Sequence, residues 1–432
     1  MNKKHLETAE KFFAILGLTF FSGGLLAGAS MNTPGLIPAS VVSFVRYFVW
    51  GTSILLICVS YKRALYVISK DIFIFIFVLI VYSSSIWSVN PGFTDRFMPE
   101  VLQMTTFGVY LATRHSLKQQ LRFVAWTFAI GAFASIYVVW RIPAAGLHWN
   151  DHPGSWKGIY DYKNTFGSLM VLNSVAFLLV PVDSAKHRLY KWGNFAIALL
   201  MIYFSTSKTS LVVSFLTIVI VLFYRNFRWK GKVTVFYLDV LILFLGSIAT
   251  IVIGLWVEIL GAMGKDATLT GRTPMWNVAF TELMNRPWFG FGRGAFWAEK
   301  SKYAIDAGYA VSQGFIPPHA HNGFIDIMLD VGFVGFGVFL ISFVIVYFRS
   351  LKLAYGSDRA EDIWPLAYLL FVTLNNVMES YLLRLANVYW VLYIATALSV
   401  TVRRTSTIKP QPKETPRLTR LSRRKSQNAF LR

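Results

Sequence analysis

Long apolar runs recur along almost the whole chain. A helix needs roughly 17–25 mostly apolar residues to cross a bilayer, and most of these runs reach that length. Twelve are counted, at approximately 12–30, 38–59, 71–88, 98–113, 120–140, 164–182, 192–206, 208–224, 234–260, 323–348, 362–378 and 381–401. The pattern predicts an all-α polytopic membrane protein with about twelve transmembrane helices.

The polar segments between the runs alternate in charge. Beginning at the N-terminus, every second segment is rich in Lys and Arg, and together these segments hold most of the 42 basic residues. Cytoplasmic segments of membrane proteins carry this excess, so both termini are expected in the cytoplasm, which requires an even number of spans. The first run is long and has no small-residue cleavage pattern, so we expect no cleavable signal peptide. The expected location is a bacterial inner membrane.

Composition agrees with this prediction. Of the 432 residues 55% are hydrophobic and 15% are charged, whereas soluble domains carry about 25% charged residues. The net charge of +21 would suggest a nucleic-acid partner in a soluble protein, but here the charges follow the topology, so we expect the lipid bilayer and no nucleic acid. Residues 1–401 form the expected membrane domain, and the basic tail 402–432 is expected to be disordered and cytoplasmic. The sole cysteine, Cys58, excludes a disulfide within the chain.

One outside segment is much longer than the others. Residues 261–322, between the ninth and tenth runs, form a loop of about sixty residues, and loops of this length are usually functional. The loop is expected to be periplasmic and to carry the catalytic residues.

Two histidines stand where this loop enters the tenth run. His319 and His321 permit three interpretations. They could bind a metal, because imidazole is a common zinc ligand, although no third ligand stands at a suitable spacing. They could simply cap the helix, or one of them could act as a general base, for which an imidazole is suited near neutral pH.

Several cations are expected on the outside face, against the positive-inside bias: Arg272, Arg293, Lys208 and Lys163, the last followed by Asn164. Arginine grips phosphate with two parallel hydrogen bonds, so a phosphate clamp is one interpretation. Salt bridges with acids of the loop, headgroup contacts, or a lysine that merely extends to the interface are the others.

Polar residues inside the apolar runs are costly unless they find partners. Asn322, Asp326 and Asp330 are spaced to share one helix face below His321 and are interpreted as residues that orient its ring. Gly332 and Gly335 are expected to permit close helix packing. Asp239, Asn375 and Asn376 are further intramembrane polar positions.

Together these motifs resemble the O-antigen ligase family of bacterial membrane glycosyltransferases, which includes O-antigen and exopolysaccharide polymerases. The strongest match is His321-Asn322, then nine residues, Gly332, two residues and Gly335. The others are Gly271-Arg272; Pro287, Gly290 and Gly292; Ser205-Thr206-Ser207-Lys208, with Lys where the family usually has Arg; and Lys163-Asn164 followed by Gly167.

The resemblance implies a GT-C-like helical fold, an undecaprenyl-diphosphate-linked glycan donor, a glycan acceptor, and neither cofactor nor metal. It implies that His321 takes a proton from the acceptor hydroxyl, and that Arg272, with Lys208 and Arg293, stabilises the leaving diphosphate. We also expect His319, Lys163 and Asn164 to bind substrate, because they are predicted to lie on the same outside face. Candidate partners are a chain-length regulator and a flippase of the same pathway.

Three functions stay open at this point. We favour a polymerase of lipid-linked repeat units over a ligase that transfers glycan to lipid A-core. The alternative from another class is a polysaccharide flippase or exporter, because twelve spans are a common transporter layout. We find no internal repeat in the sequence, and the polar residues are concentrated on one side, whereas a carrier would need them near the midplane of the membrane. Both observations argue against a carrier.

Overall fold

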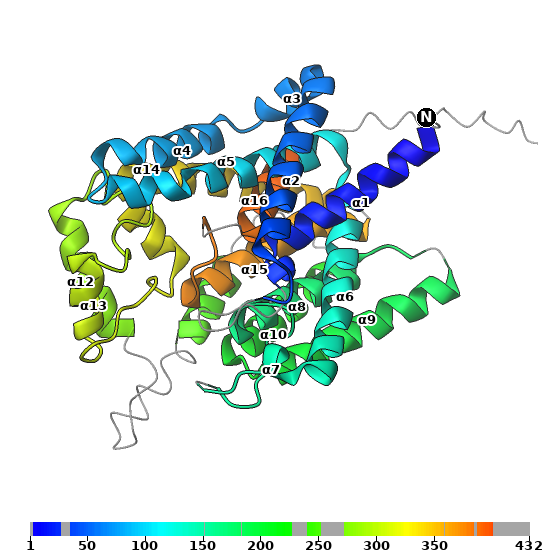
Figure 1. The fold of residues 1–432 in the computed structure, drawn as a ribbon. Coiled ribbons are helices and arrows are strands. Elements are labelled where there is room, and N and C mark those ends of the chain that lie inside the picture. Colours follow the sequence, from blue (N-terminus) through cyan, green and yellow to red (C-terminus); the bar gives the residue numbers. More distant parts are fainter. Residues whose placement is uncertain are drawn as a thin grey trace, which may run out of the picture. The chain divides into compact units, whose positions relative to one another are not determined.

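The computed structural model describes residues 3–26, 35–150, 152–182, 184–226, 240–251, 272–357, 359–383 and 387–400. Its helices are α1 (Lys3–Phe21), α2 (Ala39–Val59), α3 (Tyr61–Ile68), α4 (Ile72–Ser83), α5 (Pro91–Arg114), α6 (Leu117–Arg141), α7 (Pro143–Gly146), α8 (Lys163–Leu179), α9 (Ala185–Phe204), α10 (Lys208–Asn226), α12 (Arg272–Asn285), α13 (Lys302–Tyr309), α14 (Gly323–Tyr355), α15 (Trp364–Met378) and α16 (Val388–Ser399). Short 3₁₀ turns are η1 (Gly24–Leu26), η2 (Ser84–Trp87) and η3 (Ala360–Ile363). These residues contain no β-strand, only an isolated bridge between Leu147 and Trp156. The all-α prediction is therefore confirmed (Figure 1).

Three of the described helices are long and apolar enough to cross a membrane: α2, α6 and α14. A fourth span results if Tyr61–Ile68 and Ile72–Trp87, which meet at 90°, count as one. Shorter apolar helices include Lys208–Tyr224, Val240–Ile251 and Val388–Ser399. The structure therefore supports a polytopic membrane protein, whereas the count of twelve stays a prediction. Asp239, the tail 402–432 and residues 261–271 of the long loop lie outside the described residues.

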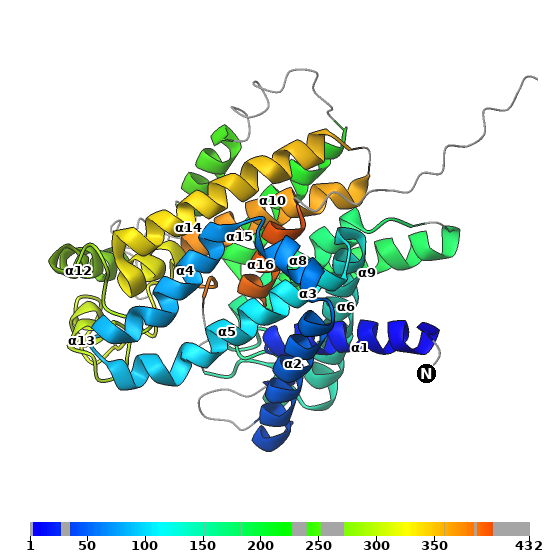
Figure 2. The same cartoon turned by 90° about the horizontal axis from the view of Figure 1, so that it is seen from above.

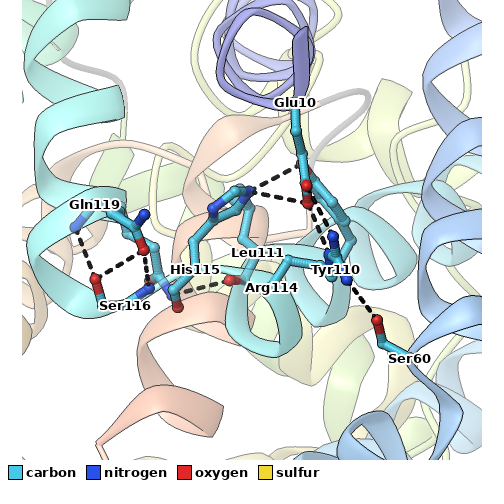
Figure 3. A network of polar contacts seen from close by, with 9 residues as sticks. Glu10, Ser60, Tyr110, Leu111, Arg114, His115, Ser116 and Gln119 are labelled. Carbon is cyan, nitrogen blue, oxygen red and sulfur yellow. Dashed lines mark hydrogen bonds and ion pairs between the residues drawn. The ribbon is translucent and has the colours of Figure 1, made fainter. Parts of the chain in front are cut away.

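A polar network joins α1, α5 and the start of α6 (Figure 3). Both carboxylate oxygens of Glu10 accept hydrogen bonds of 2.8 Å from the guanidinium of Arg114, which also donates to the hydroxyl of Ser60. Burial would raise the pKa of Glu10, but the hydrogen bonds and the charge of Arg114 lower it overall. Ser116 begins α6 with a capping box, in which its hydroxyl accepts from the backbone N–H of Gln119. The ion pair and the hydrogen bond to Ser60 join the first half of α1 to the C-terminal end of α5 and to the residue that precedes α3.

Helix α14 is interrupted at Gly332, whose φ of 66° and ψ of −170° are not helical. The break leaves backbone groups on both sides without helical partners, and loop residues 287–292 satisfy them. The carbonyl oxygen of Leu329 accepts from the N–H of Phe291, and the N–H of Phe333 donates to the carbonyl of Pro287. A Cβ atom on Gly332 would lie 2.3 Å from the backbone of Trp288, so this approach requires glycine.

This result corrects the interpretation of two sequence motifs. Gly332, the first glycine of the His-Asn-x9-Gly-x2-Gly pattern, packs against the long loop, where close packing with a helix was expected. The loop segment that it contacts is the Pro-x-x-Gly-x-Gly element. Gly290 meets the same break from the loop side, since a Cβ atom there would lie 2.5 Å from the carbonyl oxygen of Leu329. The two motifs form one structural unit.

The remainder of the loop has a hydrophobic core of its own, built by α12, α13 and the first turns of α14. Met275, Leu283, Phe291, Phe296 and Leu329 are buried in it. Figures 1 and 2 show α12 and α13 beside one end of α4, α5 and α14. The described part of the long loop is therefore a folded unit attached to the helices, which holds its functional side chains in fixed positions.

Candidate active site

Glu379, at the C-terminal end of α15, is the centre of the predicted site. Its side chain is 7% exposed, and its Oε2 lies 3.6 Å from Nδ1 of His321. Its Oε1 accepts a 2.7 Å hydrogen bond from Asn164 and lies 3.9 Å from a guanidinium nitrogen of Arg272. Burial would raise the pKa of Glu379, but His321, Arg272 and Asn164 together lower it below the usual value. The site therefore holds a buried carboxylate beside an imidazole.

His321 has a backbone conformation that is uncommon for any residue other than glycine. Its φ is +52°, and its N–H donates to Nδ1 of His319 at 3.1 Å. That bond requires an unprotonated Nδ1 on His319. Strained backbone at a polar site is a recognised sign of a positioned functional group. The ring of His321 is 29% exposed, and the two imidazole centroids are 4.1 Å apart.

The start of α14 is fixed to the end of α15 by hydrogen bonds. Asn322 caps α14, accepting from the N–H groups of Phe324 and Ile325, and donates to the carbonyl of Val377. The N–H of Gly323 donates to the carbonyl of Glu379. Asn322 therefore acts on the imidazole through the backbone: it sets where the helix begins, next to the carboxylate.

Three of the predicted cations stand at helix starts, and two of them, Arg272 and Lys163, interact with this carboxylate. Lys163 is the first residue of α8, Lys208 of α10 and Arg272 of α12. The guanidinium of Arg272 also donates to the carbonyl of Met378 at 2.9 Å. Helix N-termini carry partial positive charge and attract anions. Side-chain charge and helix charge thus have the same sign here, and the arrangement suits a polyanion such as a diphosphate.

Lys163 and Lys208 lie close enough to repel each other. Burial and the charge of Lys208 lower the pKa of Lys163, which the charge of Glu379 only partly offsets. The ammonium of Lys163 lies 3.5 Å from the hydroxyl of Thr206, a residue with a positive φ of 53° in the link before α10. The fold thus holds two cations together at a cost in stability that a bound anion would offset.

Arg293 lines a second pocket. It is 4% exposed, and its guanidinium donates to the carbonyl of Leu383. The same pocket is lined by His319, Asp326 and Asp330. Its predicted role in binding diphosphate with Arg272 and Lys208 stays a prediction, and in the structure it lines this pocket together with two acids.

Asp326 and Asp330 hold the loop against α14. Oδ1 of Asp326 accepts from the indole N–H of Trp297 and the backbone N–H of Ala320, and Oδ1 of Asp330 accepts from the N–H of Gly294. Through Ala320, Asp326 positions the residue that precedes His321. The predicted role of Asp326 in orienting the imidazole stays a prediction, now with an indirect route.

The two intramembrane asparagines also have partners. Asn375 donates to the hydroxyl of Ser168, which pairs with the hydroxyl of Tyr389. The side-chain oxygen of Asn376 accepts from the N–H groups of Tyr381 and Leu382. Asn376 therefore shapes the turn that follows Glu379, whereas Asn375 joins α15 to α8.

Sequence reasoning missed Glu379. It lies in a short link between two apolar runs and belongs to none of the recognised motifs. The available signal was an acid on a face otherwise rich in cations. Within the described residues, no group of three or more His, Cys, Asp or Glu residues is arranged to hold a metal ion.

The fold and site define a helical membrane protein with a carboxylate–imidazole pair beside a group of cations. Comparison with known proteins adds the family. The O-antigen ligase family model matches residues 193–340, which include Lys208, Arg272, Arg293, His319 and His321 but not Lys163, Asn164 or Glu379. The chain is also 24% identical over 346 residues to the exopolysaccharide production protein ExoQ of Rhizobium meliloti (strain 1021), covering 77% of each chain. The predicted resemblance to the O-antigen ligase and exopolysaccharide polymerase family is confirmed, and it implies a glycosyltransferase-type enzyme.

Proposed function

We propose that this protein polymerises undecaprenyl-diphosphate-linked oligosaccharide repeat units during exopolysaccharide assembly. The observation that carries the proposal is the imidazole of His321, 3.6 Å from the buried carboxylate of Glu379 and next to Arg272. The similarity to an exopolysaccharide production protein favours a polymerase over a ligase that transfers glycan to lipid A-core.

The proposed reaction is a single displacement at the anomeric carbon of the donor. Glu379 holds a proton on Nδ1 of His321, which leaves Nε2 free to accept a proton, as an acidic partner does for a catalytic histidine elsewhere. The acceptor hydroxyl gives its proton to Nε2 while its oxygen bonds to the anomeric carbon. The bond from that carbon to the diphosphate oxygen breaks, and undecaprenyl diphosphate leaves with the electron pair. Attack opposite the leaving group inverts the configuration.

The cations stabilise the charge that develops on the leaving diphosphate. Arg272 is the best placed, because its guanidinium lies beside Glu379 and therefore near the proposed reacting atoms. Lys163 and Lys208 add positive charge at two further helix starts. Preorganised groups of this kind usually contribute the largest share of catalysis. This mechanism requires no metal.

The test is a reconstituted assay with the host's undecaprenyl-diphosphate-linked repeat units, with and without lipid A-core, in the presence of chelator. Wild type should produce a ladder of longer lipid-linked glycans, and His321→Ala should produce none. His187→Ala, at an exposed position, is the matched control and should retain activity. Product that forms only with lipid A-core would make the protein a ligase. Full activity of His321→Ala would refute the general base, and loss of activity in chelator would refute the metal-independent mechanism.

A wild type that forms no product but moves lipid-linked glycan across the membrane would instead support the carrier.

A further inference from the structure

The second pocket is a feature that the proposed chemistry does not yet use. It has a volume of about 100 Å³, and its lining includes Phe93, Phe97, Trp297 and Arg293 with Asp326 and Asp330. It is connected to the Glu379 site through the histidines, because His319 lines it and the ring of His319 contacts that of His321, tilted by 53° at a centroid distance of 4.1 Å. A molecule in this pocket would therefore lie next to the proposed base.

Charge separates the two sites. Glu379 lies beside the guanidinium of Arg272 and interacts with the charge of Lys163, which in turn interacts with Lys208, whereas the second pocket has one guanidinium and two carboxylates. A diphosphate is attracted to the first arrangement and repelled by the carboxylates of the second. Carboxylates and a guanidinium together suit a neutral ligand with many hydroxyl groups, because they can accept and donate hydrogen bonds to it.

Aromatic rings form part of the wall. Phe93 and Phe97 lie one helical turn apart on α5, with ring centroids 4.8 Å apart, and both are partly exposed. The ring of Trp297 is fixed by its hydrogen bond to Asp326. The C–H faces of a sugar ring are apolar and pack on such surfaces, while polar groups at the edge set its orientation. Phe291, another aromatic residue of the long loop, is fully buried and does not line the pocket.

We propose that this pocket binds the acceptor sugar, the ring whose hydroxyl attacks the donor. The proposal rests on the proposed function, because it assumes that a glycan acceptor is used. It divides the site in two: lipid diphosphate beside Glu379 and Arg272, and acceptor sugar among Phe93, Phe97 and Trp297. His319 and His321 lie where the two substrates meet.

The test measures two ligands separately on full-length protein in nanodiscs. One probe is the oligosaccharide released by mild acid from the host's own lipid-linked repeat unit, which has no diphosphate. The other is undecaprenyl diphosphate. Phe97→Ala should weaken oligosaccharide binding at least fivefold and leave undecaprenyl diphosphate binding unchanged, and Phe97→Tyr, which keeps the ring, should restore it. Trp288→Ala is the matched control, since Trp288 is an aromatic residue of the long loop that is 65% exposed and does not line the pocket.

Unchanged oligosaccharide binding by Phe97→Ala would overturn the proposal. Equal weakening of both probes would also overturn it, because the pocket would then show no preference for sugar. If Phe97→Ala lost only the binding of undecaprenyl diphosphate, the pocket would belong to the donor, and the proposal would also be overturned.

The proposed function fails separately: a wild type that binds the oligosaccharide through Phe97 but neither elongates nor transfers lipid-linked glycan would retain the pocket and refute the polymerase.

Discussion

Replacing Glu379 by Gln tests the carboxylate–imidazole pair with little change in shape. The glutamine oxygen can still accept the hydrogen bond from Asn164, but the negative charge beside His321 is lost. At 3.6 Å a charge pair is worth about 1 kcal/mol in water and about 5 kcal/mol at the effective permittivity near a protein surface. Because the ring of His321 is 29% exposed and Glu379 only 7%, the contribution should lie between these limits, at about 2–3 kcal/mol.

In the proposed mechanism, that energy stabilises the imidazolium that forms as the acceptor loses its proton. Glu379→Gln should therefore lower kcat by about 30- to 150-fold, since about 1.4 kcal/mol corresponds to a factor of ten. The assay is the elongation of lipid-linked repeat units at saturating donor. Glu299→Gln, at an exposed acid of the long loop, should be close to wild type.

A double variant makes the test sharper. If Glu379 acts through His321, removing both should cost no more than His321→Ala alone, because residues that act as a unit are not additive. A Glu379→Gln enzyme within threefold of wild type would refute the reasoning. So would a double variant whose loss is the product of the two single losses.

Three further predictions follow from the described contacts. Lys163→Met should raise the thermal midpoint by about 1–2 °C, because burial lowers the pKa of that lysine and its charged form therefore destabilises the fold at neutral pH. The same variant should bind undecaprenyl diphosphate about tenfold more weakly, and a lower midpoint with unchanged binding would contradict this. Gly332→Ala should cost about 3 kcal/mol or more in thermal denaturation, given its positive φ and blocked Cβ, whereas Gly337→Ala, with open space around it, should be tolerated. Glu10→Gln should cost about 2 kcal/mol relative to exposed Glu7→Gln. The pKa of Glu10 is lowered in the fold, so the stability difference between wild type and Glu10→Gln should be complete at a pH above the ordinary glutamate pKa of 4.5. It should shrink as the pH falls below that value.

The sequence predicted the helices well, because they depend on local composition. Apolar runs set where helices form, and a cation at the start of a run marks a helix start, as Lys163 and Lys208 do. Run length alone does not set the helix bounds. The run 381–401, for example, contains the helix Val388–Ser399, because Asn376 and the residues after it form a turn first.

Pairings between distant segments could not be predicted in this way. Glu379 and His321 are 58 positions apart, and only the packing of α14 against α15 brings them together. The sequence around Gly332 does not show whether this glycine packs against another helix or interrupts the helix that contains it. Arg293 and Arg272 both follow glycine in one loop, yet they line different sites, because the loop folds around its own hydrophobic core.

The break at Gly332 gives the stretch from Gly323 to Val331 a fixed length as well as a fixed position. Its first residue is bonded to Glu379, and its last turn is bonded to the loop at Phe291. An inserted residue would turn one end relative to the other by about 100° and move it about 1.5 Å along the axis. His321 would then face away from Glu379, although every side chain of the site would still be present. If His321 and Glu379 act as proposed, helical phase between two anchored ends determines activity in its own right.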